Sequence, residues 1–153
     1  MLIPILFGKI CNLAIETLWK IDPQNLEFQK VISGALVHRE WGVRKTANIY
    51  LRLMKPADPH IRLAIARTLE DEHSAVRASA AAAIKEIKPK DKTTLSAIVK
   101  CLKNPQLSIR EVCGELLGML QKAGEMCIPD FFTAPLSEEE IRNLLEVLNS
   151  EKY

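Results

Sequence analysis

Glycine is scarce in this sequence, and so are aromatic residues. Its 153 residues include six glycines, eight prolines and 5% aromatic residues, whereas 48% are hydrophobic and 26% are charged. This balance excludes collagen-like, low-complexity and disordered chains, and it is typical of a globular protein. Leu, Ile, Ala, Lys and Glu dominate, which favours helix over strand. We therefore expect a single all-α domain spanning residues 1–153.

Long hydrophobic runs are also absent. No apolar stretch approaches the roughly 20 residues that a membrane-spanning helix requires. Residues 1–7 are apolar, but no basic leader precedes them and no convincing small-residue cleavage site follows. We expect neither a membrane span nor a secretion signal.

Closely spaced cysteine pairs are missing as well. The four cysteines are Cys11, Cys101, Cys113 and Cys127, and none lie at the short spacing of zinc or redox motifs. Two of them fall on predicted buried helix faces, so we expect free thiols in the core. Free thiols are typical of a reducing compartment, and we expect the cytoplasm.

A strong excess of one charge is lacking, although the charges are unevenly distributed. Residues 1–55 hold eight Lys or Arg against four Asp or Glu, whereas residues 91–153 hold seven against ten. The basic excess is well below the dense basic stripe of most nucleic-acid-binding domains. Nucleic-acid binding through the first half is therefore only an alternative, and affinity that falls steeply with salt would mark it.

The sequence does contain an internal repeat of 33 residues. An apolar residue followed by arginine recurs at Val43-Arg44, Val76-Arg77 and Ile109-Arg110. Apolar or small residues follow at offsets of 4, 8 and 11, which describes one face of an α-helix. We call this helix of each repeat the B helix.

A second helix, the A helix, precedes each B helix. Its apolar face is marked by isoleucines and leucines at the same interval, at Ile32, Ile65, Ile98, Leu36, Leu69 and Leu102. Proline separates the repeats, and Asp58-Pro59 predicts an N-cap followed by proline in the first helical turn. We expect an α-solenoid of stacked antiparallel hairpins. Its parts are a truncated first repeat (1–22), full repeats (23–55, 56–88 and 89–122) and a C-terminal cap (123–153).

Residues 71–84, which read DEHSAVRASAAAAI, resemble a HEAT repeat of the short bacterial kind, including the repeats of phycobilisome lyases. The resemblance covers residues 25–122 and implies a HEAT-like superhelix. It also implies a structural ladder in which Arg44, Arg77 and Arg110 pair with turn carboxylates of neighbouring repeats. Asp71 fills the acidic turn position, but His38 and Asn104 stand there in the flanking repeats. We therefore expect an incomplete ladder.

The two ends depart from the period. Residues 137–148 predict a capping helix that begins at Ser137, whereas the A helix of the first repeat is cut short. Two interpretations of the uncapped beginning stay open. The chain is the C-terminal piece of a longer repeat protein, or its first repeat associates with another copy.

The outward positions of the B helices are the candidate binding surface, because B helices line the concave side of such solenoids. The predicted partner-binding residues are Trp19, Lys45, Asn48, Arg52 and Lys85. Small residues at equivalent positions predict an open floor for a partner helix or peptide, at Ala78, Ala81, Gly114 and Gly118.

Catalytic and metal-binding patterns are not evident. His38, His60 and His73 lack the spacing that would place two metal ligands on one helix face, and no glycine-rich phosphate loop occurs. We expect no cofactor, no metal and no catalytic residue. The expected function is a protein-binding scaffold. The alternatives that the resemblance implies are a bilin lyase-like enzyme or a DNA alkyl-base glycosylase-like enzyme.

Overall fold

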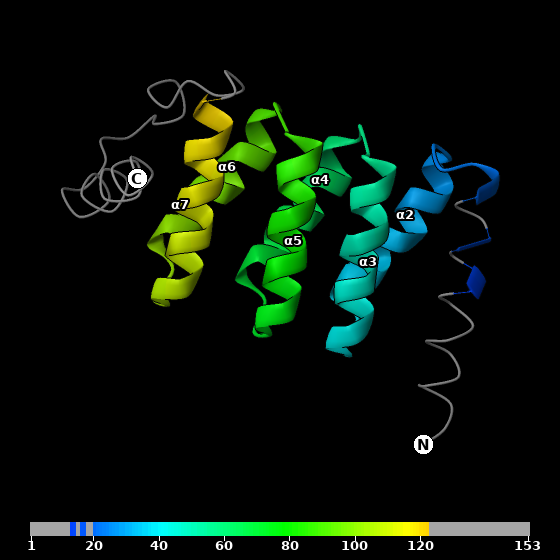
Figure 1. Cartoon of the computed structure of the whole chain (residues 1–153), viewed down its shortest axis with the longest axis horizontal. Coiled ribbons are helices and arrows are strands. Elements are labelled where there is room, and N and C mark those ends of the chain that lie inside the picture. The colour runs from blue at the N-terminus through cyan, green and yellow to red at the C-terminus, as the bar shows by residue number, and fades with distance from the viewer. Residues whose placement is uncertain (1–12, 15, 18–19, 123–153) are drawn as a thin grey trace.

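The computed structural model describes residues 13, 14, 16, 17 and 20–122, and this part of the chain is helical without any strand. Its helices form three hairpins that stand side by side (Figure 1). The A helices are α2 (Leu26–Gly34), α4 (Pro59–Arg67) and α6 (Lys92–Lys100), each extended by one 3₁₀ turn, at Ala35–Val37, Thr68–Glu70 and Cys101–Lys103. The B helices are α3 (Trp41–Met54), α5 (Ser74–Ile87) and α7 (Leu107–Lys122).

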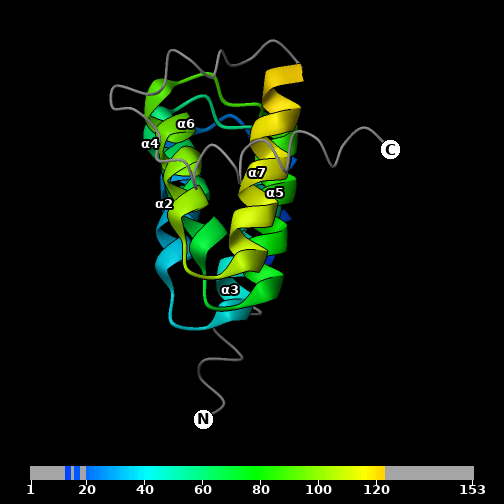
Figure 2. The same cartoon turned by 90° about the vertical axis from the view of Figure 1, so that its left-hand side faces the viewer.

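The hairpins build two layers of helices. Figure 2 shows α2, α4 and α6 in one layer and α3, α5 and α7 in the other. Within the layers, α4 packs between α2 and α6, and α5 packs between α3 and α7. Each hairpin therefore contributes one helix to each layer and contacts its sequence neighbours in both.

The apolar columns of the sequence lie between the two layers. The isoleucine and leucine columns of the A helices are at most 3% exposed, at Ile32, Ile65, Ile98, Leu36, Leu69 and Leu102. The matching columns of the B helices are buried too, at Ala47, Ala80, Cys113, Leu51, Ile84 and Leu117. These side chains belong to one continuous core cluster, so the hairpins cohere through hydrophobic burial along their whole length.

Each A helix begins at a side-chain cap, and these caps recur at the 33-residue interval. The side chains of Asn25, Asp58 and Asp91 accept hydrogen bonds from backbone N–H groups in the first turns of α2, α4 and α6. Pro59 occupies the first position of α4, where the proline ring fits the helix and no donor is lost. The N-cap and proline predicted at Asp58-Pro59 are thereby confirmed.

Two B helices end at a lysine in the left-handed conformation. Lys55 caps α3 with φ 48°, and Lys88 caps α5 with φ 49°. The backbone N–H of each lysine donates to the fourth carbonyl before it, on Leu51 and Ile84. This geometry normally favours glycine, because a Cβ atom in the left-handed region crowds the following carbonyl.

Replacing Lys88 with glycine is expected to stabilise the fold. The change relieves the left-handed strain, and we expect the free energy of unfolding to rise by about 0.5–1 kcal/mol, net of the greater freedom of glycine in the unfolded chain. Urea denaturation followed by circular dichroism measures the difference. The matched control is Lys85→Gly in the last turn of α5, which should lower stability by roughly 1 kcal/mol. A loss of stability in both variants would contradict the assignment of Lys88 as a strained cap.

The cysteines of the third hairpin are buried free thiols. Cys101 lies on the 3₁₀ turn after α6, and Cys113 faces the core from α7. A hydrogen bond with Cys101, together with burial, raises the pKa of the Cys113 thiol above its ordinary value. Such thiols act as small apolar side chains. Cys11 and Cys127 lie outside the described residues.

In the described part of the chain, no helix is both long and apolar enough to cross a bilayer.

Candidate functional site

Three of the predicted partner-binding residues lie on the outer side of the B layer. Lys85 is exposed, whereas Lys45 and Arg52 are partly exposed. Arg52 also reaches toward α5, where its Nε lies 3.8 Å from Glu86 Oε1. Trp19 lies outside the described residues. Basic side chains of α3 and α5 therefore share one surface.

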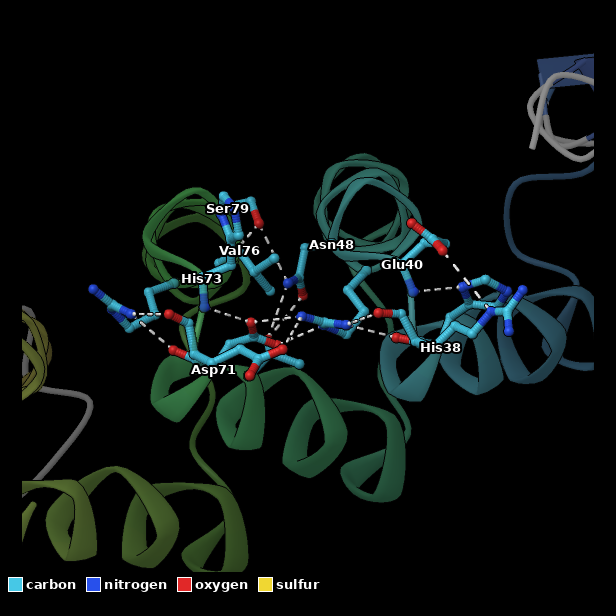
Figure 3. Close-up of polar contacts among 12 residues, drawn as sticks. His38, Glu40, Asn48, Asp71, His73, Val76 and Ser79 are labelled. Carbon is cyan, nitrogen blue, oxygen red and sulfur yellow. Dashed lines mark hydrogen bonds and ion pairs between the residues drawn. The ribbon is translucent and has the colours of Figure 1, made fainter. Parts of the chain in front are cut away.

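Asn48 does not belong to that surface, and its prediction as a partner-binding residue was wrong. Its side chain is fully buried, with 0% exposure. Asn48 Nδ2 donates to Thr68 Oγ1 at 3.0 Å and to Ser79 Oγ at 3.3 Å (Figure 3). Thr68 and Ser79 belong to the second hairpin, so Asn48 ties the first hairpin to the second through polar atoms.

The cause of this error is the packing within the B layer. The equivalents of Asn48 are Ala81 and Gly114, and both are buried, as is Gly118. Asn48 contacts Ser79 of α5, so this column faces the next helix of the B layer, where a small residue such as Ala81 lets the backbones approach closely. The floor predicted at Ala81, Gly114 and Gly118 is therefore buried, whereas Ala78 is exposed as predicted.

The positions that do face outward lie 0, 4 and 7 residues from Lys45 on α3 and from Ala78 on α5, and 0 and 4 residues from Glu111 on α7. We call this surface the outer B face. It comprises Lys45, Ile49 and Arg52 of α3, Ala78, Ala82 and Lys85 of α5, and Glu111 and Glu115 of α7. All of these side chains are exposed or partly exposed.

The three arginines that recur at the start of the B helices share one structural role. Each donates from Nη1 to the two backbone carbonyls that lie six and five residues before it in the hairpin turn. The distances are 2.7 and 2.9 Å for Arg44, 2.8 and 3.2 Å for Arg77, and 2.7 and 2.9 Å for Arg110. The repeated arginine thus ties each turn to its own B helix.

Arg44 alone among these three arginines also pairs with a carboxylate of the next hairpin. Its Nε donates to Asp71 Oδ2 at 2.7 Å and its Nη2 donates to Asp71 Oδ1 at 3.0 Å, and both side chains are 9% exposed. Asp71 Oδ1 also accepts the backbone N–H of His73 at 2.9 Å (Figure 3). At the next junction Asn104 replaces the acid, and its Nδ2 donates to Glu70 Oε1 instead. The described part therefore contains one rung of an Asp–Arg ladder.

The Arg44–Asp71 pair shifts the pKa of both partners. Burial by itself would raise the pKa of the Asp71 carboxyl, but the hydrogen bonds from Arg44 and from the His73 N–H outweigh burial, so this pKa lies below its ordinary value. The hydrogen bond to Asp71 raises the pKa of Arg44, although burial opposes it. The folded state therefore favours the charged form of both groups.

Acid is expected to remove the contribution of this pair to stability. Because the folded pKa of Asp71 is depressed, its contribution is complete above the unfolded pKa of about 3.9 and is lost as the pH falls through the folded pKa. The difference in unfolding free energy between the wild-type protein and Asp71→Asn should therefore be constant near neutral pH and shrink below about pH 4. Urea titrations from pH 7 to pH 2.5 measure it. A difference that stays constant over this range would contradict the assignment.

An aromatic stack next to this pair was missed in the sequence. The rings of Trp41 and His73 are nearly parallel, 4.2 Å between centroids and 7° between planes. Trp41 begins α3 and His73 immediately precedes α5, so the stack bridges the first and second hairpins. Trp41 thus contacts the neighbouring turn while its side chain is 43% exposed.

The other two histidines lie at a hairpin turn and at a helix start. His38 Nδ1 accepts the backbone N–H of Glu40 at 3.0 Å, and His60 is exposed at the start of α4. No cluster of three or more potential metal ligands occurs within residues 20–122 or the described positions before them.

No protein-family model, curated protein or solved structure matches this chain.

Proposed function

We propose that this chain is a HEAT-like α-solenoid whose outer B face binds a peptide or protein segment. The observation that carries the proposal is the agreement between the 33-residue period and the position of every A helix, 3₁₀ turn and N-cap in the three hairpins. Regular stacking of this kind presents equivalent positions of successive helices side by side, which gives an extended surface suited to a long partner.

The composition of the outer B face supports a peptide or protein partner. Ala78 and Ala82 are short side chains on the central helix, and longer side chains stand on both flanking helices. A segment laid over α5 would therefore contact α3 and α7 at its sides. The partly exposed Ile49 and the exposed Leu53 add apolar area beside the charges, which is the mixture found at many protein interfaces.

The alternatives are less consistent with this face. A DNA alkyl-base glycosylase-like enzyme needs cations, an aromatic residue and a carboxylate in one basic groove. Here Lys45 and Arg52 lie on α3, whereas Glu111 and Glu115 lie on α7, with α5 between them. Two exposed carboxylates on the same face would also repel nucleic-acid phosphates. No side chain of the described part favours a bilin lyase-like activity in particular.

A peptide library displayed on phage tests the proposal. Peptides selected on the wild-type protein should bind Ala78→Arg at least about tenfold more weakly, because a long charged side chain fills the space over α5 and a loss of 1.4 kcal/mol is tenfold in affinity. The matched control is Thr93→Arg, which adds the same side chain at an exposed position of the other layer. Equal binding to both variants would place the peptides elsewhere and refute the proposal.

Self-association through the first hairpin is a second candidate. Of the eight exposed large apolar side chains in the described part, five precede residue 38, including Val31 at 71% exposure. Val31 lies on α2 near the partly exposed Phe28, whereas the equivalents of Phe28 in α4 and α6, Ile61 and Thr94, are buried. This side of α2 is thus apolar and partly exposed, and the same side of α2 in a second copy would bury it by symmetry.

The molar mass in solution decides whether this second interaction occurs. Light scattering across concentration should show a dimer that Val31→Glu converts to a monomer, since a buried charge at the interface is costly. Thr93→Glu adds the same charge on α6 and should leave the mass unchanged. A wild-type monomer at every concentration would contradict self-association and leave the proposal for the outer B face untouched.

A further inference from the structure

The charge of the outer B face changes sign from one helix to the next. In the column that begins at Lys45, the equivalent residues are Ala78 and Glu111. The column that begins at Ile49 continues with Ala82 and Glu115, so its charge also becomes negative on α7. The face is therefore basic on α3 and acidic on α7.

On the outer B face the central helix carries one charged residue, Lys85, and the exposed Glu86 next to it in the sequence offsets that charge. Lys85 and Glu86 are both exposed on α5, and Glu86 lies near Arg52 of α3. The distance of 3.8 Å between Arg52 Nε and Glu86 Oε1 is longer than a hydrogen bond, and the Arg52 side chain remains 34% exposed. The exposed outer face thus has a positive edge, a neutral middle and a negative edge.

The repeated arginines do not cancel this gradient. Each B helix begins with one of these arginines, at Arg44, Arg77 and Arg110, so each helix receives one positive charge from them. Arg44 is further neutralised by Asp71. The pairing of Arg44 with Asp71 lowers the positive charge of α3 only at the hairpin turn, so the gradient of the outer B face rests on Lys45 and Arg52 against Glu111 and Glu115.

The spacing of the helices sets the length of a matching partner. Packed helices lie 8–10 Å apart, so α3 and α7 are separated by roughly 20 Å across α5. A partner helix covers about 20 Å with roughly 13 residues, and an extended strand covers it with about six. The charges of a complementary segment should be separated by one of these two intervals.

We propose that the partner is a bipolar protein segment, with acidic side chains at one end and basic side chains at the other, which lies across α3, α5 and α7. Its acidic end contacts Lys45 and Arg52, its small or apolar middle lies over Ala78 and Ala82, and its basic end contacts Glu111 and Glu115. This inference rests on the proposed function, and it specifies the chemistry and the direction of the partner on that face.

Synthetic peptides that carry the same six charged residues test the charge pattern. One peptide carries three Glu and three Lys at opposite ends of a neutral helical spacer of about 13 residues, which matches the helix rise. A second peptide has the same spacing in an extended, proline-containing spacer of about six residues. For each of the two, an alternating peptide contains the same residues with Glu and Lys in alternating order. Fluorescence anisotropy at 50 and 150 mM salt measures their affinities. We expect one of the two separated peptides to bind at least tenfold more tightly than its alternating peptide.

Charge reversal on one helix tests the direction. Glu111→Lys should weaken the better separated peptide about tenfold, since it places like charges together at the basic end. Glu27→Lys makes the same change at an exposed position of α2 in the other layer and should leave the affinity within twofold. Equal binding of separated and alternating peptides, or equal effects of the two reversals, would overturn the bipolar partner.

The two proposals fail in different ways. If library peptides respond to Ala78→Arg but lack separated acidic and basic clusters, the bipolar partner is refuted and binding at the outer B face stands. If no peptide responds to Ala78→Arg, both proposals are refuted.

Discussion

Replacing Asp71 with alanine is expected to lower the free energy of unfolding by about 3 kcal/mol, because it leaves a mostly buried guanidinium without its counter-charge. The Arg44 side chain is 9% exposed, so water cannot fully replace the two hydrogen bonds that it donates to Asp71. The backbone N–H of His73 loses its acceptor as well. Urea denaturation at pH 7, followed by circular dichroism, measures the loss.

The neighbouring acid is the matched control for this change. Glu72 Oε1 lies 3.6 Å from Arg44 Nη2, but the Glu72 side chain is 87% exposed. Glu72→Ala should therefore cost less than about 0.5 kcal/mol, as exposed ion pairs usually do. The double variant Arg44→Met/Asp71→Leu should recover part of the loss, since it removes both charges together. Equal losses in the two alanine variants would show that proximity to Arg44, rather than burial, determines the effect.

Replacing Ala81 with leucine is the second large expected effect, with a loss of about 2 kcal/mol because Ala81 is buried in the column that Asn48 uses to contact the next helix. The added side chain has to enter the contact between B helices, which forces α5 away from its neighbours or into a strained rotamer. Ala78→Leu is the matched control, three residues earlier on the exposed face. It should change stability by no more than about 0.5 kcal/mol. The reverse order of effects would show that the outer B face has been assigned to the wrong column.

Much of the architecture followed from the spacing of apolar residues. The period of 33 placed the A and B helices, and Asp58-Pro59 located the start of α4, because local capping and helical periodicity depend on residues that are close in sequence. The incomplete acidic column, with His38 and Asn104 on either side of Asp71, likewise predicted an incomplete ladder, and one rung occurs within the described hairpins.

The assignment of small and polar residues to a surface was less successful. Asn48 was expected outside because it is polar, although its equivalents Ala81 and Gly114 are small, which indicates a close helix contact. The sequence does contain a pattern that indicates this buried contact. Asn48, Thr68 and Ser79 are all polar, whereas the residues 33 positions later are Ala81, Cys101 and Val112. Three coordinated changes of this kind indicate side chains that satisfy one another.

Contacts between turns were harder to anticipate. The stack of Trp41 on His73 joins residues of two different turns, and helical periodicity says nothing about how turns meet. The pairing of Arg52 with Glu86 depends similarly on the offset between α3 and α5. Sequence positions alone do not fix that offset, because it results from packing over the entire layer.

The polar junction between the first and second hairpins also specifies which of these similar hairpins lie next to each other. Units with matching apolar faces can dock on the wrong neighbour during folding, which is a known failure of repeat proteins. Among the described hairpins, only the pairing of the first with the second brings Arg44 to Asp71 and Asn48 to Thr68. A misplaced third hairpin would offer Asn104 and Cys101 at those positions and leave the buried polar groups unsatisfied. Hydrophobic burial thus supplies adhesion, and a few polar atoms specify the neighbour.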